Sequence, residues 1–596
     1  MPIVKRFEQS IKILTIRGYR FSRYPKQILI LLATVSLICT QVVAQDVPIY
    51  SPRDIFHPVI AENGMVSSQE SYATEAGLAV LKEGGNAIDA AVTMGFTMAV
   101  TLPSAGNIGG GGFMVVHLAD ENKTIAIDYR EKAPKAATRD MFLDETGDVD
   151  PEKSRHSYLA VGVPGTVAGL TMALEKYGTI SLARALQPAI ELAENGFPVS
   201  EYLHRSLIAV KERMQAYPAS MTIFYKPGGE PYQIGETLVQ RDLAQSLRLI
   251  AREGSKAFYQ GAIADAIVAE MEAHGGLISQ ADLAEYQPVI REPIRGTYRG
   301  YEIYSMPPPS SGGIHLVQLL NILEAFPLEE LGQNTAQTIH LITESMKLAY
   351  ADRSKYLGDT DFVSVPISGL ISKSYAEQLR RKINLDQATP SQEIAPGNPN
   401  PFIESNNTTH YSVMDNQGNA VANTYTLNFS YGSKITVPGT GILLNNEMDD
   451  FSAKPGVPNA FGLIGGEFNA IEPEKRMLSS MTPTIVLKDK KPFLVTGSPG
   501  GSRIITTVLQ VILNVIDHDM NIAEATNAVR VHHQWLPDQL MIEQGLNKDT
   551  MRLLEDKGHQ ITVTNTMGST QSIMLVDQTL NGASDPRRPG ALTLGY

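Results

Sequence analysis

The sequence predicts a layered α/β fold that is built as one large unit of 596 residues. Short alternating and β-branched segments after Asn407 are typical of sheet strands. The segment 503–516, RIITTVLQVILNVI, has no polar face, so as a helix it must be covered on both sides. No proline-rich or serine-rich linker and no repeat divides the chain, and a hydrophobic content of 43% supplies a large core.

Residues 1–44 have the layout of a secretory signal peptide. Seven Lys and Arg residues precede an apolar run, 28–39, which is shorter than the roughly 20 residues that a membrane helix needs. The small residue Ala44 predicts cleavage before Gln45. A start further downstream or an uncleaved anchor are the alternatives.

Composition excludes several classes of function. Cys39 is the only cysteine and would leave with the signal peptide, so the mature chain would have no disulfide, thiol nucleophile or thiolate metal ligand. The net charge of −13 becomes about −19 when seven basic residues and Glu8 are removed. Nucleic-acid binding is therefore not expected.

The first 400 residues predict a helical scaffold around one hairpin. Two helices are expected within 67–101, interrupted at Gly84-Gly85, and the second is apolar nearly all round. Four glycines, 109–112, lead into a predicted hairpin that ends at Arg130. The segment 164–388 is expected to be mostly amphipathic helix, with 181–196 and 335–357 as the clearest cases.

A second hairpin begins at Thr408 and turns through NQGN. Because the turn has three or four residues, the position opposite Thr408 is 426 or 427, which brings Thr426 and Asn428 beside it. This polar cluster at one end of an apolar hairpin is either a site or a set of solvated hydroxyls.

Three further segments carry candidate site residues. Gly500 and Gly501 join a strand to the helix 503–516 and present either two amide donors or a tight turn, without the spacing of a phosphate loop. The acids after Asn446 form either an ammonium site or a solvated loop. Ser479 and Ser480 bind a carboxylate or cap a turn. There is no GxSxG or HExxH motif, and the pair His532-His533 is interpreted as structural.

Several segments match one protein family, and they run through the whole mature chain in order. They include ATEAGLAVLKEGGNAIDAAV, GNIGGGGFMVVH, AIDYREKAP, TTHYSVMDNQGNAVANTYTLN, GILLNNEMDDFSAKPGVPN, LSSMTPT and LVTGSPGGSRIITTVLQ. In these segments the chain resembles the gamma-glutamyltransferase (gamma-glutamyl transpeptidase) family of bacterial periplasmic type. The resemblance implies the αββα sandwich of N-terminal nucleophile hydrolases. It also implies a periplasmic location.

The resemblance implies that the precursor cuts itself between Asn407 and Thr408. The products would be a large subunit, 45–407, and a small subunit, 408–596, which together form a heterodimer. Thr408 would become the nucleophile, and its new α-amino group, with a pKa of about 7.7–8.0, would be the general base. Thr426 is implied as the residue that hydrogen-bonds Thr408.

The resemblance also implies the substrate pocket of a γ-glutamyl group, as in glutathione. The α-carboxylate would be held by Arg130, Ser479 and Ser480, and the α-ammonium by Asn428, Glu447 and Asp450. Gly500 and Gly501 would stabilise the oxyanion. The acyl group would pass to water, an amino acid or a dipeptide. No cofactor and no metal are implied.

Two positions depart from the family pattern, and two other functions remain open. Glu447 stands where many bacterial members have glutamine, which predicts stronger selection for an ammonium group. Phe461 stands where close relatives have tyrosine, which predicts a looser lid and more hydrolysis. A glutaryl-cephalosporin acylase of the same fold would leave Glu447 and Asp450 facing an apolar chain. A non-catalytic periplasmic binding protein would be expected to lack Thr408 or the glycine pair.

Overall fold

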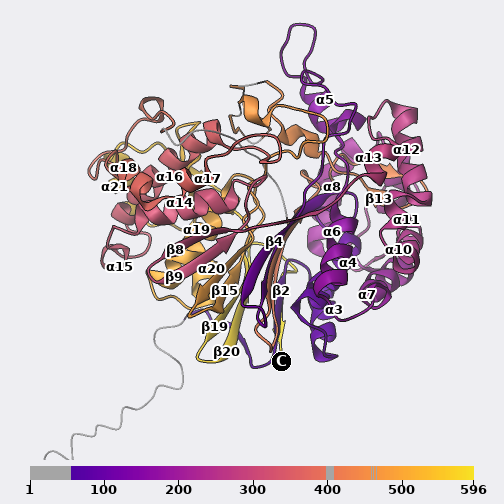
Figure 1. The fold of residues 1–596 in the computed structure, drawn as a ribbon, viewed down its shortest axis with the longest axis horizontal. Helices are drawn as coiled ribbons and strands as arrows, with labels where there is room; N and C mark the ends of the chain where they lie inside the picture. Colours follow the sequence, from indigo (N-terminus) through magenta and orange to yellow (C-terminus); the bar gives the residue numbers. More distant parts are fainter. Residues whose placement is uncertain (1–54, 398–408, 455, 458, 461, 465) are drawn as a thin grey trace, which may run out of the picture. The chain divides into compact units, whose positions relative to one another are not determined.

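Two seven-stranded antiparallel sheets form the centre of the fold (Figure 1). The computed structural model describes residues 55–397, 409–454, 456–457, 459–460, 462–464 and 466–596. The predicted signal peptide, Asn407, Thr408 and Phe461 therefore lie outside the described residues. Residues Phe56–Tyr596 group into one compact unit.

The first sheet contains strands from both ends of the described chain. In spatial order its strands are β1 (Val59–Ala61), β20 (Thr579–Ser584), β19 (Gln571–Val576), β15 (Lys491–Thr496), β14 (Thr484–Lys488), β9 (Tyr301–Ser305) and β8 (Ile294–Tyr298). The second sheet has the order β21 (Leu592–Gly595), β2 (Met65–Ser68), β10 (Thr409–Met414), β11 (Ala420–Thr426), β3 (Gly111–Leu118), β4 (Lys123–Tyr129) and β7 (Val289–Arg291).

The sheets pack face to face, and helices cover their outer faces. Strand β3 shows the arrangement, because Phe113 and Val115 enter the core between the sheets whereas Met114 and Val116 enter the core under the helices. This alternation is the two-residue period of a strand that is buried on both faces. The result is a helix–sheet–sheet–helix layering, in agreement with the layered α/β prediction.

The helices on the outer face of the second sheet belong to the first half of the chain. They include α3 (Ser71–Lys82), α4 (Ala87–Thr101), α6 (Thr166–Tyr177), α7 (Leu182–Asn195), α8 (Glu201–Met214), α10 (Arg241–Glu253) and α12 (Ala262–His274). Helix α4 is buried at every residue, as its apolar sequence predicts, and Asn86 and Asp89 form a capping box at its start.

The helices beside the first sheet are α14 (Gly312–Leu323), α16 (Ala336–Tyr356), α18 (Lys373–Arg380), α19 (Arg503–Ile516), α20 (Ile522–Asn527) and α21 (Lys548–Asp556). Helix α19 has the predicted bounds and contacts both α14 and α20. The helix predicted within 335–357 is present as α16, but the prediction that it is amphipathic was wrong. Most of this helix is buried, including the charged residues Lys347 and Arg353, because neighbouring segments cover several of its faces. It is therefore not an amphipathic surface helix.

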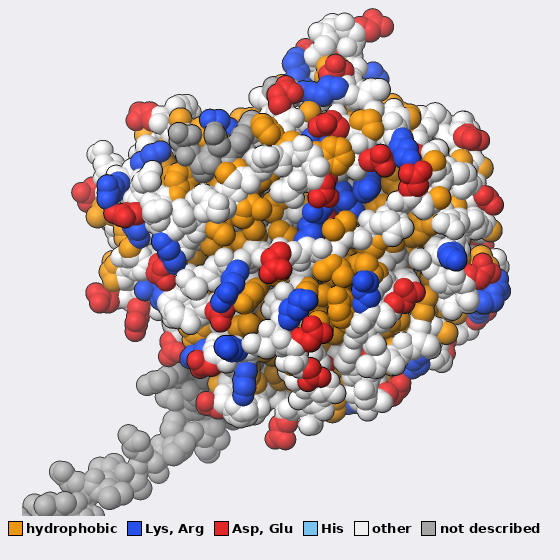
Figure 2. Space-filling model, in the orientation of Figure 1, with side chains coloured by type: hydrophobic (Ala, Val, Ile, Leu, Met, Phe, Trp, Pro, Cys, Tyr) orange, Lys and Arg blue, Asp and Glu red, His pale blue; other side chains and the backbone are white. Residues whose placement is uncertain are grey.

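Other elements refine the predictions without changing the layers. The two helices expected within 67–101 are present, but residues 67–68 belong to strand β2. Strands β7, β8 and β9 interrupt the segment that was expected to be mostly helix. On the face drawn in Figure 2, acidic and basic side chains are scattered among one another. Within the described ranges no helix is both long and apolar enough to cross a bilayer.

Candidate functional site

The register of the second sheet collects the predicted site residues at one edge. Thr409 at the start of β10 pairs with Tyr425 near the end of β11, and Thr426 pairs with Gly111 at the start of β3. The neighbouring pair joins Gly112 to Tyr129, the residue before Arg130. Because the strands are antiparallel, the end of one lies beside the start of the next. This edge therefore carries both Thr426 and Arg130.

Asn428 leaves an acceptor open at this edge. Its backbone amide donates to the Thr426 hydroxyl at 2.8 Å, and its side-chain Nδ2 donates to the Asn446 carbonyl at 3.0 Å. Its φ of 73° lies in the left-handed region, which asparagine tolerates better than most residues. The Oδ1 atom is buried and has no hydrogen-bond partner among the described residues. Such an atom is suited to accept from a ligand.

Gly500 lines the same cavity as Thr426 and Asn428, and Gly501 follows it in the chain. The two glycines follow β15 with φ values of 133° and 66°, which favour glycine. In the part of the chain that the structure describes, neither amide has an acceptor, whereas their carbonyls accept from Arg503 and Ile504. Gly500, Thr426 and Asn428 line one cavity of about 300 Å³. The pair therefore offers two open donors beside the threonine edge.

A buried charge cluster forms the other half of the site. The Arg130 guanidinium contacts a Glu447 oxygen through Nη1 and an Asp450 oxygen at 2.5 Å through Nη2. Glu131 lies 3.6 Å from Nη1, and all four side chains are fully buried. Nε and Nη2 also donate to the carbonyls of Met477 and Leu478, each at 3.2 Å. The acids after Asn446 are thus not a solvated loop, which removes one of the two sequence interpretations.

The cluster holds three carboxyl groups around one guanidinium, and their protonation reflects this excess. Burial raises the pKa of Glu131 to about 7. Burial also raises the pKa of Glu447 well above its ordinary value. The repulsion from Glu131 and Asp450 raises it further, and the attraction of Arg130 offsets only part of these effects. Both Glu131 oxygens and Glu447 Oε2 are buried without a hydrogen-bond partner in the described chain. The cluster is therefore suited to a second cation.

Ser479 and Ser480 precede β14 and are fully buried next to this cluster. The Ser479 hydroxyl accepts from the Met481 amide at 3.1 Å, and its carbonyl accepts from the Ser311 amide at 2.7 Å. The Ser480 hydroxyl accepts from the Arg353 guanidinium. Because the Ser479 hydroxyl oxygen accepts from the Met481 amide, its proton can be directed to a ligand carboxylate.

Arg353 and Glu131 are site residues that sequence reasoning missed. Arg353, on α16, also donates through Nε to the Ser311 hydroxyl at 3.2 Å, and burial lowers the pKa of its guanidinium to about 9. A charged residue at a buried position of an otherwise apolar helix face is a signal that could have found it. Glu131 directly follows Arg130, and its sequence position gives no comparable signal.

The histidine pair lies outside this site and is hydrogen-bonded within the protein. His532 Nδ1 forms a hydrogen bond with the Thr506 hydroxyl at 2.9 Å, and His533 Nε2 lies 3.1 Å from a carboxylate oxygen of Asp538. Burial lowers the pKa of both imidazoles. The structural interpretation of this pair agrees with these contacts.

Comparisons with known proteins converge on one family. A family model described as Gamma-glutamyltranspeptidase matches residues 73–594. The chain is 56% identical over 546 residues to the glutathione hydrolase proenzyme of Escherichia coli (strain K12), covering 91% of this chain and 94% of that relative. The crystal structure of cephalosporin acylase from Bacillus halodurans matches with a TM-score of 0.81 at 30% identity, over 93% of this chain and 98% of that one. Helicobacter pylori gamma-glutamyltranspeptidase matches with a TM-score of 0.54 at 51% identity, over 55% and 93% of the two chains.

Proposed function

Because the chain belongs to the gamma-glutamyltranspeptidase family, we propose that it cleaves the γ-glutamyl amide of glutathione and related compounds through a γ-glutamyl–threonine ester. The group passes to water or to an amino acid or peptide. The observation that carries this proposal is the buried cluster around Arg130, in which three carboxyl groups face one guanidinium.

A γ-glutamyl group is a zwitterion at its α-carbon, and the cluster has the complementary charges. In the free protein Arg130 contacts Glu447 and Asp450. When the substrate binds, its α-carboxylate pairs with the Arg130 guanidinium and its α-ammonium pairs with Glu447 and Asp450. Each ion pair within the protein is thus replaced by an ion pair with the substrate. Ser479 and Ser480 donate to the same carboxylate, and the open Oδ1 of Asn428 accepts from the ammonium.

Cleavage between Asn407 and Thr408 creates the nucleophile in this proposal. The described β10–β11 register pairs Thr409 with Tyr425, and its continuation by one residue would set position 408 opposite Thr426. A new N-terminal amine has a pKa of about 7.7–8.0, so part of it is unprotonated near neutral pH and can act as the base. The mature enzyme then consists of subunits 45–407 and 408–596, located in the periplasm after removal of residues 1–44.

The chemical steps balance with the residues of this edge. The Thr408 hydroxyl oxygen attacks the γ-carbonyl carbon and its proton moves to the α-amino group. The amides of Gly500 and Gly501 stabilise the oxyanion. When the C–N bond of the substrate breaks, the protonated α-amino group of Thr408 gives this proton to the leaving amine. Water or an acceptor amine then cleaves the ester and restores the threonine hydroxyl.

The charge excess also argues against a glutaryl-cephalosporin acylase. A glutaryl group has no ammonium, so it would leave the carboxylates of Glu447 and Asp450 buried and unmatched, which is costly. The chain is also 56% identical to a glutathione hydrolase proenzyme and 39% identical to the Acylase ACY 1 proenzyme of Pseudomonas sp. (strain SE83).

A substrate pair that differs only in the ammonium tests the proposal. The kcat/KM for γ-glutamyl-p-nitroanilide is expected to exceed that for glutaryl-p-nitroanilide by at least about a hundredfold, or roughly 3 kcal/mol. Glutamate release from glutathione, measured with the same preparation, checks the natural class of substrate. Equal kcat/KM values for the two anilides would contradict the proposed binding pocket. Absence of turnover of both anilides would contradict the proposed enzymatic activity.

A further inference from the structure

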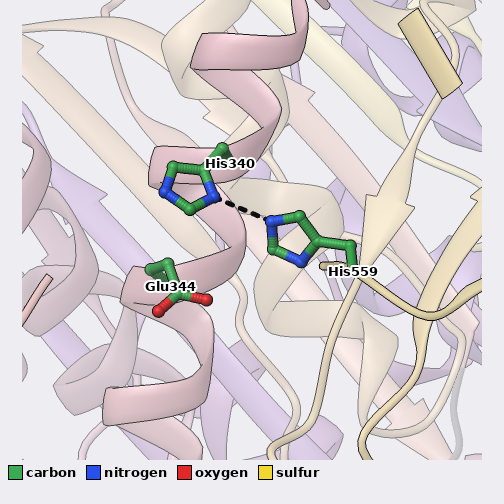
Figure 3. Close-up of side chains that lie close together, drawn as sticks. All are labelled: His340, Glu344 and His559. Atoms are coloured by element: carbon green, nitrogen blue, oxygen red, sulfur yellow. Dashed lines mark hydrogen bonds between the residues drawn. The ribbon is translucent and has the colours of Figure 1, made fainter. Parts of the chain in front are cut away.

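Figure 3 shows a second buried cluster, formed by His340 and Glu344 of α16 and by His559. His340 and Glu344 are four residues apart, so they point from one face of the helix. His559 follows α21 and approaches the same face, with its Nε2 atom 2.8 Å from His340 Nδ1. One ligand atom from each of the three buried residues lies within 4.8 Å of the others.

A hydrogen bond to a backbone carbonyl directs the Nδ1 lone pair of His340 toward His559. His340 Nε2 lies 2.7 Å from the Asn384 carbonyl, which can only accept, so the ring carries its proton on Nε2. Its Nδ1 lone pair therefore faces His559. A backbone carbonyl on the distal ring nitrogen is the usual arrangement behind a metal-binding histidine, because it fixes the tautomer.

Glu344 supplies a carboxylate, which brings the negative charge that suits a divalent cation. Its Oε2 accepts from the Thr389 amide at 3.1 Å, and its Oε1 forms an ion pair with Lys347.

The ammonium group of Lys347 occupies the Glu344 carboxylate that a metal ion would bind, and it also contacts two other groups. Its ammonium lies 2.9 Å from Glu344 Oε1, donates to the Thr389 carbonyl at 2.8 Å and lies 3.7 Å from Asp538. Removing it from Glu344 thus leaves it with an acceptor and a carboxylate. Glu344 also lines a cavity of about 350 Å³, which gives an ion and its water a path of entry.

We propose that His340, Glu344 and His559 bind one divalent transition-metal ion, with Zn²⁺ as the best match. Two imidazole nitrogens and one carboxylate oxygen are a known zinc ligand set, and a water from the cavity would complete the tetrahedron. On binding, His559 moves its proton from Nε2 to Nδ1 and Lys347 releases Glu344. If the chain is cut as proposed above, the ion joins the two subunits, since His559 follows the cut; this consequence alone rests on the proposed function.

Isothermal titration with ZnCl₂ of the full-length protein, stripped with EDTA and dialysed, tests the site. We expect about one ion per chain, and a loss of affinity of at least about tenfold in His340→Gln and in His559→Gln. The control is His518→Gln, a half-buried histidine outside the cluster, which should bind as the wild type does. Equal affinity in all four proteins, or no stoichiometric binding to the wild type, would overturn the proposal.

A second measurement covers the case in which the glutamine variants fail to fold. Co²⁺ added to the wild-type protein should give the visible absorption of a low-symmetry, nitrogen-ligated site, and one equivalent of Zn²⁺ should remove it. Absence of that absorption would also overturn the proposal. Repeating the titration on Thr408→Ala separates the two proposals, because a metal site should persist in this variant whether or not the chain is cut.

Discussion

Two buried charge clusters in this protein differ in balance. Around Arg530, two arginines face two acids: Arg530 lies 2.6 Å from Asp585, and Arg587 lies 2.6 Å from Glu543. Although burial opposes it, Arg530 and Arg587 hold the pKa of Asp585 below its usual range. The Arg130 cluster instead has three carboxyl groups for one arginine, and two of them have raised pKa values.

The difference distinguishes a structural cluster from a binding site. All carboxylate oxygens of the Arg530 cluster have partners, so its charges are compensated within the protein. The Arg130 cluster keeps buried oxygens without hydrogen-bond partners, which costs free energy unless a ligand supplies the missing donors. An unbalanced cluster at the meeting point of several strand ends is therefore informative about function.

The largest effect is expected when the Arg530 cluster, whose charges are balanced, is broken, and the quantity affected is the stability of the fold. Arg530→Met leaves buried Asp585 with one of its two cations, so the free energy of unfolding should fall by about 3–5 kcal/mol. Urea denaturation followed by circular dichroism measures this loss. A change below about 1 kcal/mol would mean that the cluster does not stabilise the fold.

Altering the unbalanced cluster should instead reduce catalysis. Arg130→Lys retains the charge but loses the planar fork, so kcat/KM for γ-glutamyl-p-nitroanilide should fall about a hundredfold, or roughly 3 kcal/mol. The matched control is Arg295→Lys, an exposed arginine paired with Glu302 at 2.5 Å, which should retain wild-type kinetics. A loss of stability without a kinetic effect would make Arg130 structural.

Glu131 should make stability depend on pH. Its folded pKa of about 7 exceeds the ordinary value, so its contribution is complete below about pH 4.5 and is lost as the pH rises through 7. Glu131→Gln should remove a decline of roughly 3 kcal/mol between pH 4.5 and 8, measured by urea denaturation. The exposed Glu285→Gln serves as the control, and a parallel decline in Glu131→Gln would contradict this assignment.

Glu447→Gln tests selection for the ammonium group. It replaces an acid that can ionise beside the substrate ammonium with a neutral amide, so the preference for γ-glutamyl over glutaryl anilide should decrease about tenfold, or roughly 1.4 kcal/mol. The ratio of the two kcat/KM values measures this preference. An unchanged ratio would mean that Asp450 alone recognises the ammonium.

The smallest effect is expected at Phe461, which lies outside the described residues. Phe461→Tyr adds a hydroxyl that can latch a lid, so the ratio of transfer to hydrolysis with glycylglycine as acceptor should rise by a few-fold, or less than about 1 kcal/mol. Chromatographic quantification of both products measures it. An unaltered ratio would remove the lid hypothesis.

Sequence patterns predicted the parts of the fold that depend on local periodicity. The hairpin of β3 and β4 and the apolar helix α19 are present as predicted, because strand alternation and a fully apolar helix are visible in short windows. The end of β2 was predicted as helix, since Ser67 and Ser68 are as compatible with a helix start as with a strand end. Residues that depend on tertiary packing were not predictable in this way.

The candidate site divides along the same line. Arg130, Glu447 and Asp450 were named from the family resemblance, and the structure brings them into contact. That Arg353 reaches Ser480 was not predicted, because the two lie 127 positions apart and meet only when α16 packs beside the segment before β14. Periodicity shows that a helix exists, but it does not show which element covers a given face.

Self-cleavage that exposes an N-terminal threonine is the step on which the proposed mechanism depends. The intact mass, under denaturing conditions, of protein purified from the periplasm measures it. We expect two species whose masses place the break between Asn407 and Thr408, and a single uncut chain for Thr408→Ala. A single uncut species from the wild-type protein, active on γ-glutamyl-p-nitroanilide, would contradict it.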